Sequence, residues 1–265
     1  MSEPRAEIAI IGGSGFYRFL EQAETVEVET PFGEPSAPIS IGAVGDRQVA
    51  FIPRHGTDHR FPPHRVPYRA NLWALKELGV TRVFGPCAAG SLRREVEPRT
   101  LVVCDQAIDF TRDRPTTFYD GPQTTHVSFA DPYCPTLREV LVKRAADHGI
   151  PHRDGGTMVV IEGPRFSTRA ESRMFSQVGA DVIGMTQFPE VTLARELELC
   201  YATVALVTDY DVGVDDIQPV THEEVLKVFA ENIDSVRDLL AASIPAVPAE
   251  RTCPCATALA GTGHA

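Results

Sequence analysis

Short apolar runs alternate with amphipathic stretches along most of the chain. Apolar runs of strand length, ending in Gly, Pro or polar residues, occur at 7–11, 48–56, 81–92, 100–110, 156–166, 180–186 and 201–207. Stretches with helical periodicity lie at 66–80, 135–150, 167–179, 189–200 and 221–244. Two of these begin with capping boxes, because Thr168 precedes Glu171, and Thr221 precedes Glu224, by three positions. This alternation predicts an α/β fold with a mostly parallel, buried sheet.

The C-terminal end differs in composition from the rest of the chain. No linker interrupts residues 1–244, which we expect to form one domain, whereas residues 245–265 are rich in Pro and Ala and predict a tail. The tail carries Cys253 and Cys255, expected as two exposed thiols, with a redox-sensitive disulfide as the less favoured alternative. None of the six cysteines forms a CxxC pair, so a zinc site has weak support and no metal is expected.

Polar or small residues follow several of the strand-like runs at once. Ligands of α/β proteins bind beyond the carboxyl ends of parallel strands, so these positions are candidates for a site. Six places qualify, and we expect them to converge: Gly12–Gly15, Arg54–His55, Cys87–Ser91, Phe166, Met185–Thr186 and Asp209–Asp211.

Two of these places suit an anion. The turn "GGSG" lacks the third glycine of a dinucleotide fingerprint and the lysine of a P-loop, yet its backbone N–H groups and Ser14 can hold phosphate. An ordinary turn explains it equally well. Arg54 is a residue type that binds phosphate bidentately. His55 is followed by His59 and His64, which we interpret as loop histidines rather than metal ligands, because Pro62 and Pro63 prevent the three from sharing one helical face.

The other places suit a flat, polar-edged ring. Phe166 follows a strand and can stack on a ring, although a core phenylalanine is the commoner case. Asp209 and Asp211 follow the apolar run 201–207, where carboxylates need partners to offset desolvation. A turn or helix cap is their ordinary role, but neither begins an obvious helix.

The charge and hydropathy of the chain limit the kinds of partner that we expect. The 265 residues carry a formal net charge of −11, whereas nucleic-acid binders are usually basic, so small molecules are the expected partners. The sequence contains no run of eighteen apolar residues and its first residues lack a signal-peptide pattern. We therefore expect a cytoplasmic protein with no membrane or nucleic-acid partner.

Taken together, the motifs resemble one family. "IIGGSGF", "PRHG", "AAGSL", "FADPYCP", "GTMVVIEGPRFSTRAES", "MTQFPEVTLARELELCYA" and "TDYD", in this order over roughly residues 7 to 244, resemble the 5′-methylthioadenosine phosphorylase branch of the trimeric purine nucleoside phosphorylases. The resemblance implies a single α/β domain with a central mixed sheet flanked by helices, packed as a homotrimer. It also implies transfer of a ribosyl group from a nucleoside to inorganic phosphate, a co-substrate, without metal or organic cofactor.

The resemblance assigns roles to individual residues. It assigns phosphate binding to Ser14, Arg54, His55, Cys87, Ala88 and Thr186. It assigns ribose binding to Met185 and the backbone near Ala88. Phe166 packs on the purine, and His126 reaches the neighbouring subunit's site near the sugar's 5′ end. For Asp209 we add a chemical hypothesis: with a raised pKa it protonates N7 of the leaving base, while Asp211 helps to read the 6-amino edge. Two aspartates favour adenine over hypoxanthine.

Two positions depart from the branch. Cys87 stands where a threonine usually contacts phosphate, and a thiol is a weak donor. His222 stands where a small apolar residue normally lies beside the methylthio group, and "HEEVL" resembles the general purine nucleoside phosphorylases, whose histidine binds the 5′-hydroxyl. Val225 still offers apolar contact. Cleavage of 5′-methylthioadenosine is therefore the main expectation and a broader purine nucleoside phosphorylase the alternative. A hydrolase and a non-catalytic purine-binding regulator rank lower.

Overall fold

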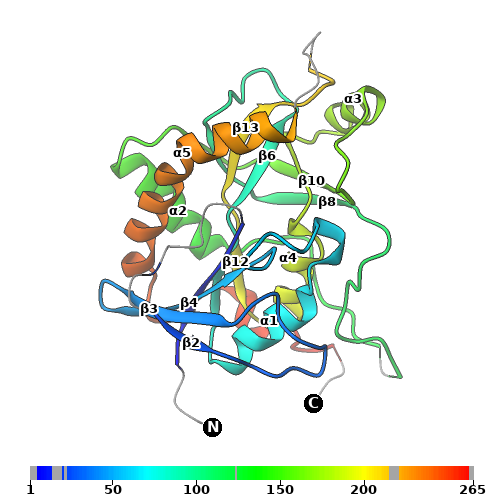
Figure 1. Cartoon of the computed structure of the whole chain (residues 1–265). Coiled ribbons are helices and arrows are strands. Elements are labelled where there is room, and N and C mark those ends of the chain that lie inside the picture. Colours follow the sequence, from blue (N-terminus) through cyan, green and yellow to red (C-terminus); the bar gives the residue numbers. More distant parts are fainter. Residues whose placement is uncertain (1–4, 14–19, 21–22, 123, 215–220, 263–265) are drawn as a thin grey trace.

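The structure is a computed structural model that describes residues 5–13, 20, 23–122, 124–214 and 221–262; in the last segment the side chains of residue 222 and residues 224–226 are not described. Its strands form two hydrogen-bonded sheets (Figure 1). The first sheet has the order β12-β5-β1-β4-β3-β2. Its strands are β1 Ile8–Gly12, β2 Glu24–Val26, β3 Ile39–Val44, β4 Arg47–Pro53, β5 Arg82–Phe84 and β12 Cys200–Ala202.

The second sheet has the order β8-β10-β11-β6-β13-β7-β9. Its strands are β6 Cys87–Ser91, β7 Leu101–Val103, β8 Gln106–Phe110, β9 His152–Asp154, β10 Thr157–Ile161, β11 Val182–Gly184 and β13 Ala205–Tyr210. Of the eleven strand pairs among the described residues, seven are parallel and four antiparallel. The predicted α/β class with a mixed, mostly parallel sheet is confirmed, although its strands divide into two sheets.

The two sheets adjoin each other where one pair of neighbouring strands is interrupted. The pair β5–β12 runs into the pair β6–β13, and Gly85 N–H still donates to the Ala202 carbonyl at 2.9 Å. Pro86 lies at the break and has no N–H to donate to the ladder. For this reason the runs 81–92 and 201–207, each expected as one strand, contain two. The run 100–110 was also expected as one strand and instead forms β7 and β8, in different places of the second sheet.

Among the described residues, five α-helices lie at the five predicted positions: α1 Tyr68–Glu77, α2 Pro135–Asp147, α3 Arg169–Gln177, α4 Gln187–Glu196 and α5 His222–Ser243. Short 3₁₀ turns occur at η1 Pro63–Arg65, η2 Ile244–Ala246 and η3 Pro254–Thr257. The capping box of Thr168 and Glu171 is confirmed at the start of α3. The second capping box depends on the side chain of Glu224, which lies outside the described residues. Strands β2, β3 and β9 were not expected from the sequence.

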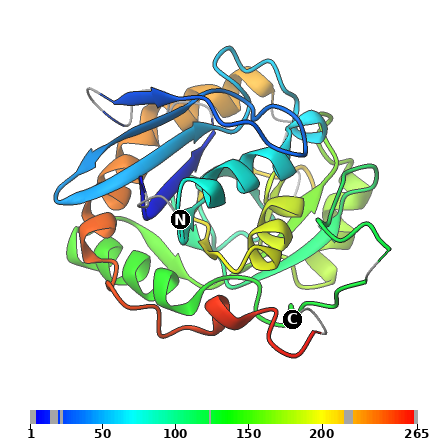
Figure 2. The same ribbon diagram turned by 90° about the horizontal axis from the view of Figure 1, so that it is seen from below.

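Helices cover both faces of the first sheet. Figure 1 shows α2 and α5 on one side of β12 and α1 and α4 on the other, and Figure 2 shows α1 and α4 side by side. Successive side chains of a strand point to opposite faces. Ile8 and Ile10 of β1 accordingly belong to the core under α2 and α5, whereas Ala9 and Ile11 belong to the core under α1 and α4. Burial on both faces explains the uninterrupted apolar run in the sequence.

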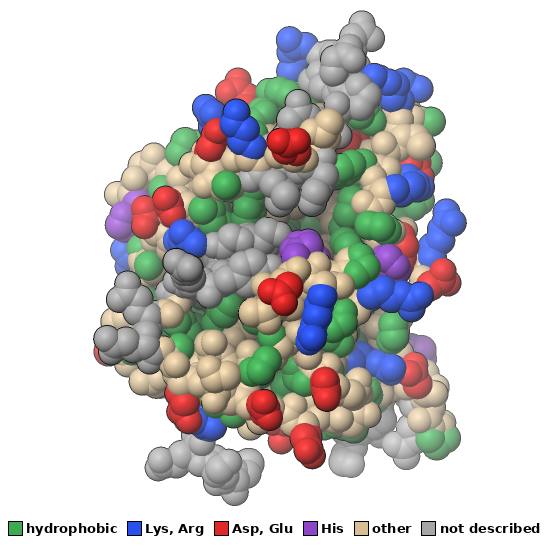
Figure 3. All heavy atoms as spheres, in the orientation of Figure 1, with side chains coloured by type: hydrophobic (Ala, Val, Ile, Leu, Met, Phe, Trp, Pro, Cys, Tyr) green, Lys and Arg blue, Asp and Glu red, His purple; other side chains and the backbone are tan. Residues whose placement is uncertain are grey.

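Residues 245–262 pack along the body of the molecule, as the red segment of Figure 2 shows. The buried Arg82 holds the backbone of this segment, because its Nη2 donates to the Pro248 and Ala249 carbonyls at 2.8 and 2.7 Å. The expectation of two exposed thiols is wrong, because Cys255 is 1% exposed and Cys253 is partly buried. On the face in Figure 3, basic side chains lie among acidic ones. No helix of the described residues combines the length and apolar character needed to cross a membrane.

Candidate active site

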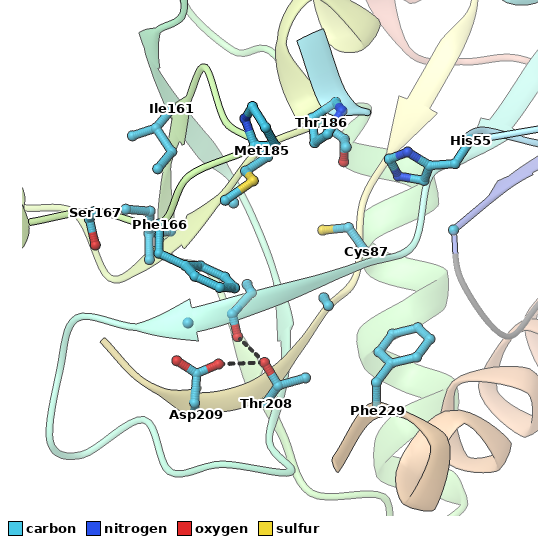
Figure 4. A pocket seen from close by; sticks show the side chains of 18 of the residues that line it. His55, Cys87, Ile161, Phe166, Ser167, Met185, Thr186, Thr208, Asp209 and Phe229 are labelled. Carbon is cyan, nitrogen blue, oxygen red and sulfur yellow. Dashed lines mark hydrogen bonds between the residues drawn. The ribbon is translucent and has the colours of Figure 1, made fainter. Parts of the chain in front are cut away.

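The carboxyl ends of the strands surround a cavity of about 450 Å³ (Figure 4). All six places selected from the sequence contribute to its lining, because a parallel arrangement brings strand ends to one edge of the sheet. The predicted residues brought together here are Arg54, His55, Cys87, Ala88, Phe166, Met185, Thr186, Asp209 and Asp211, and Gly13 represents the Gly-rich turn. In Figure 4, Phe166 and Asp209 lie at one side, and His55 and Thr186 at the other.

A β-bulge places the acidic end of β13 in the cavity. Along the ladder with β6, Val207 pairs with Ala89 and Asp209 with Gly90, so Thr208 is an extra residue. A bulge re-aims side chains that would otherwise alternate between faces. Thr208 and Asp209 consequently both line the cavity. The Thr208 hydroxyl lies 2.6 Å from Asp209 Oδ1 and 3.3 Å from the Ala89 carbonyl, and these bonds fix the orientation of the carboxylate.

Asp211 is the more buried of the two acids. Its residue is 7% exposed, and the Ser167 hydroxyl lies 2.7 Å from both carboxylate oxygens. Its backbone N–H donates to the Ser91 carbonyl at 2.8 Å. Asp211 therefore joins the end of β13 to the segment that carries Phe166, and Ser167 partly offsets the desolvation of its carboxylate.

Arg54 is held in a buried ion pair that the sequence did not reveal. Its Nε and Nη2 atoms donate to the two oxygens of Glu190 at 2.7 and 2.8 Å, with side-chain exposures of 1% and 0%. Nη2 and Nη1 also donate to the Ile11 and Pro86 carbonyls at 3.0 and 3.1 Å. Burial lowers the pKa of Arg54, but the Glu190 charge outweighs burial and the pKa is raised, so the guanidinium stays charged.

The fork of Arg54 is therefore turned toward Glu190 rather than toward the cavity. A guanidinium has five N–H donors, and the described residues engage four of them. The fifth is on Nη1, near Gly13, where a Cβ built on the glycine would lie 3.5 Å from Nη1. The arginine thus offers one fixed N–H at the cavity wall, instead of the bidentate contact expected from its residue type.

His55 is a neutral imidazole in this setting. Burial, and then the positive charge of Arg54, lower its pKa to about 3. Its Nδ1 lies 2.8 Å from the Phe61 carbonyl, which can only accept, so Nδ1 carries the proton. The other nitrogen, Nε2, is then an acceptor. His55 is matched to a donor such as the hydroxyl of a protonated phosphate.

Neutral groups complete this end of the cavity. Burial raises the pKa of the Cys87 thiol, whose Sγ lies 3.8 Å from the Thr203 hydroxyl. A protonated thiol brings no negative charge to an anion site. Thr186 is 7% exposed and directly precedes α4, and its side chain makes no capping bond to that helix. Its hydroxyl can therefore turn to a ligand.

A second buried arginine, Arg114, hydrogen-bonds the backbone at the ends of two strands. Arg114, 5% exposed, donates from Nη1 to the Met185 and Phe188 carbonyls at 2.8 and 2.5 Å. Its Nη2 donates to the Glu162 and Ile161 carbonyls at 2.5 and 3.3 Å. Backbone groups released at the ends of β10 and β11 thereby find partners. Met185 is held in place on this support.

Apolar side chains form the rest of the lining. Phe166 is 42% exposed in the single chain, and Figure 4 shows its ring pointing into the cavity. Met185 reaches the cavity from the end of β11, where Gly163 leaves room for its thioether. Phe229, 5% exposed, enters from α5. These groups suit a ring or an alkyl substituent.

Four predicted site residues are not brought to the cavity by the described part of the chain. Ser14 lies outside the described residues. His222 begins α5, but its side chain and that of Val225 are likewise outside the description. His126 is exposed and is not among the described residues that line the cavity.

Several lining or supporting residues were missed by the sequence analysis. Glu190, Arg114 and Phe229 lie on stretches that carry ordinary helix or loop patterns, and only their three-dimensional neighbours give them a role. Ser167 and Thr208 adjoin predicted residues, so adjacency was the available signal. Of the described residues, the group able to hold a metal ion consists of four cysteines that do not line the cavity.

Similarity to known proteins fits this geometry. Residues 7–245 match the model of the Phosphorylase superfamily. A Thermococcus kodakarensis protein named S-methyl-5′-thioadenosine phosphorylase is 58% identical over 252 residues, covering 95% of this chain and 97% of the relative. A Streptomyces coelicolor protein named purine nucleoside phosphorylase is 53% identical over 267 residues, covering 97% and 95%.

Solved structures give the same picture. A methylthioadenosine phosphorylase sourced from an Antarctic soil metagenomic library superposes with a TM-score of 0.92 at 41% identity, covering 98% of this chain and 93% of that chain. The Schistosoma mansoni methylthioadenosine phosphorylase in complex with adenine superposes with a TM-score of 0.88 at 36% identity, covering 93% of each. With a matching family model over most of its length and relatives above 50% identity, this chain belongs to the phosphorylase superfamily.

Proposed function

We propose that the protein cleaves the N-glycosidic bond of 5′-methylthioadenosine with inorganic phosphate, giving adenine and 5-methylthioribose 1-phosphate. The observation on which this proposal rests is a single cavity that is lined by two aspartates, by groups suited to an anion and by apolar side chains. The Thermococcus kodakarensis relative, 58% identical over nearly the full length, bears the name of this activity. No metal or organic cofactor enters the proposal.

Phosphate is assigned to the end formed by Arg54, His55, Cys87 and Thr186, with Ala88 and Ser14. The Nη1 of Arg54 donates one N–H, Nε2 of His55 accepts from a phosphate hydroxyl, and the Thr186 hydroxyl adds a donor. Charge-assisted bonds of this kind are stronger than neutral ones. Held against this wall, a phosphate oxygen is positioned to attack the anomeric carbon of the ribose, which Met185 covers.

The base is assigned to the opposite end. Phe166 packs on the purine, and Asp209, when protonated, donates to N7 as the glycosidic bond breaks. This proton neutralises the negative charge that develops on the leaving purine. The Thr208 hydroxyl lies 2.6 Å from Asp209 Oδ1 and so orients the carboxyl group that donates this proton. We place Asp211, which Ser167 holds in position, beside the purine edge, where its carboxylate accepts a hydrogen bond from the 6-amino group.

The 5′-substituent is assigned to α5. Phe229 lies four residues, about one helical turn, after Val225. An aromatic ring favours a thioether by up to about 1.5 kcal/mol. Phe229 is thus the described residue that most supports a methylthio group.

A broader purine nucleoside phosphorylase is the second candidate. One observation favours it: the Streptomyces coelicolor relative is named purine nucleoside phosphorylase. The sequence-based expectation that His222 binds a 5′-hydroxyl points the same way. The two candidates differ in the preferred substrate and share the same chemistry.

Release of free base from methylthioadenosine, adenosine and inosine, each with and without phosphate, tests the proposal. We expect methylthioadenosine to react fastest and only with phosphate. A faster reaction of adenosine or inosine selects the broader enzyme, and base release without phosphate refutes phosphorolysis.

The proposal includes a homotrimer in the cytoplasm that returns purine bases to salvage, with His126 completing the site of a neighbouring subunit. Exposed apolar side chains support an interface: Met174 of α3 and Val178 at its C-terminal cap are 38% and 60% exposed, and Phe110 of β8 is 46% exposed. Large apolar side chains gathered on a surface often mark contact sites.

A mixing experiment tests the role of His126. Subunits carrying His126→Ala are unfolded together with inactive Asp209→Asn subunits and reassembled at equal amounts. If His126 acts across the interface, random assembly restores about a quarter of the sites, because an intact Asp209 then meets an intact neighbouring His126. No recovery in mixtures shown to contain both subunits refutes the assignment.

A further inference from the structure

Four cysteines from three distant parts of the chain meet at the start of β12, outside the cavity. Cys134 precedes α2, Cys200 begins β12, and Cys253 and Cys255 lie at η3. Their sulfur atoms all lie within 4.8 Å of one another. Cys134, Cys200 and Cys255 are 1%, 2% and 1% exposed, and Cys253 is partly buried. The proposed reaction uses none of them.

The spacing of the sulfurs matches the ligands of a single ion. Tetrahedral zinc with Zn–S bonds of about 2.3 Å has sulfur–sulfur distances of about 3.8 Å. The Sγ atoms of Cys200 and Cys253 are 3.3 Å apart, and the largest separation in the group is at most 4.8 Å. The tetrahedral distance of about 3.8 Å lies between these two values. Disulfides would instead join the sulfurs in two separate pairs at about 2.05 Å.

The surroundings suit a negatively charged metal–thiolate group. Zinc with four thiolates carries a net charge of −2, which needs compensation in a buried place. Cys134 is the N-cap residue of α2, a 13-residue helix whose positive dipole end faces it. The positive charge of Arg195 acts on the Cys255 thiol. Four sulfur ligands select zinc over harder cations such as magnesium.

We propose that Cys134, Cys200, Cys253 and Cys255 bind one zinc ion in a structural site. Because all four positions are filled by protein ligands, the ion has no open position for substrate. It fastens the segment 247–262 to α2 and β12, adding to the arginine contacts of that segment. Binding releases the thiol protons, so the affinity falls as pH is lowered. The site is independent of the proposed phosphorolysis.

The test measures metal in protein purified under reducing conditions from zinc-supplemented cells. We expect one zinc per chain in the wild type and in the matched control Cys104→Ser, whose thiol is buried elsewhere and bonds the Val102 carbonyl at 3.8 Å. The Cys253→Ser/Cys255→Ser variant should contain at least tenfold less zinc. Cobalt added to metal-free wild type should give the visible absorption of a tetrahedral tetrathiolate complex, which the double variant lacks.

A second measurement on the wild type covers the case in which the variant does not fold. A thiol-modifying mercurial should release the zinc in step with modification of four cysteines, which an indicator dye reports. The proposal is overturned if the wild type holds less than one-fifth of an equivalent of zinc with its thiols reduced. It is also overturned if the intact mass of the wild type shows the loss of two hydrogens for each disulfide formed. Zinc retained by the double variant overturns it as well.

Discussion

The buried pair of Arg54 and Glu190 allows a quantitative test of how the anion end of the cavity is built. Glu190→Gln keeps the shape of the side chain but removes its charge, leaving Arg54 charged at 1% side-chain exposure. Removing one partner of a buried ion pair costs about 3–5 kcal/mol. We expect the free energy of unfolding to fall by that amount, a large share of the roughly 5–15 kcal/mol typical of a domain.

The assay is urea unfolding followed by far-ultraviolet circular dichroism at one fixed protein concentration, since subunit association affects apparent stability. The matched control is Glu24→Gln, which breaks a pair with Arg5 whose side chains are 41% and 68% exposed. Exposed pairs contribute about 0–1 kcal/mol, so the control should change little. Added phosphate should restore more stability to Glu190→Gln than to the wild type, because an anion then compensates Arg54.

A loss below about 1 kcal/mol in Glu190→Gln, equal to that of the control, would refute the reasoning. The double variant Arg54→Met/Glu190→Met separates charge from packing. Replacing a whole buried pair with apolar residues is often neutral for stability. Tyr201, which donates to Glu190 Oε1 at 2.6 Å, keeps Gln187 Oε1 at 3.0 Å as a partner. The double variant should therefore be more stable than Glu190→Gln while losing phosphorolysis, and equal instability would contradict the charge argument.

Three further predictions follow from single positions. Asp209→Asn should lower kcat with methylthioadenosine by about 10²–10⁴-fold and with inosine far less, and equal losses would exclude the proton-donor role. His55 is buried with a pKa of about 3, so below about pH 6.5 only the unfolded chain gains its proton; stability should fall by up to about 1.4 kcal/mol per pH unit as pH drops, and His55→Gln should flatten that slope in unfolding titrations. Gly85→Ala places a Cβ 2.0 Å from Tyr201 Oη, and its melting temperature should fall by the equivalent of about 1–3 kcal/mol; an unchanged value would contradict the packing.

Much of the site was predictable because its determinants are local. Each of the six selected places follows an apolar run, and the convergence of parallel strand ends needs no knowledge of side-chain contacts. The five helices were predictable for the same reason, since Thr168 and Glu171 mark a start within four residues. The division of residues 100–110 into β7 and β8 was not, because both halves are apolar enough for one strand.

The missing parts depend on contacts between distant residues. Glu190 is one of several acids in a helical stretch, and only the fold brings it to Arg54, 136 positions away. The bulge at Thr208 arises from the register of β13 on β6, which no periodicity encodes. The cysteine cluster joins positions 134, 200, 253 and 255, so a search for CxxC spacing failed to find it.

The charge balance of the anion end fits the proposed reaction better than a strongly cationic pocket would. Glu190 compensates Arg54, His55 is neutral and the Cys87 thiol is protonated, so the wall offers hydrogen-bond donors and acceptors with little net charge. Phosphate bound there keeps its negative charge, which stabilises the cationic ribosyl group formed as the bond to the base breaks. Uncompensated positive charge beside it would weaken the nucleophile and oppose the developing cation. Burying an arginine together with its counter-ion thus gives precise hydrogen-bond geometry without that opposing field.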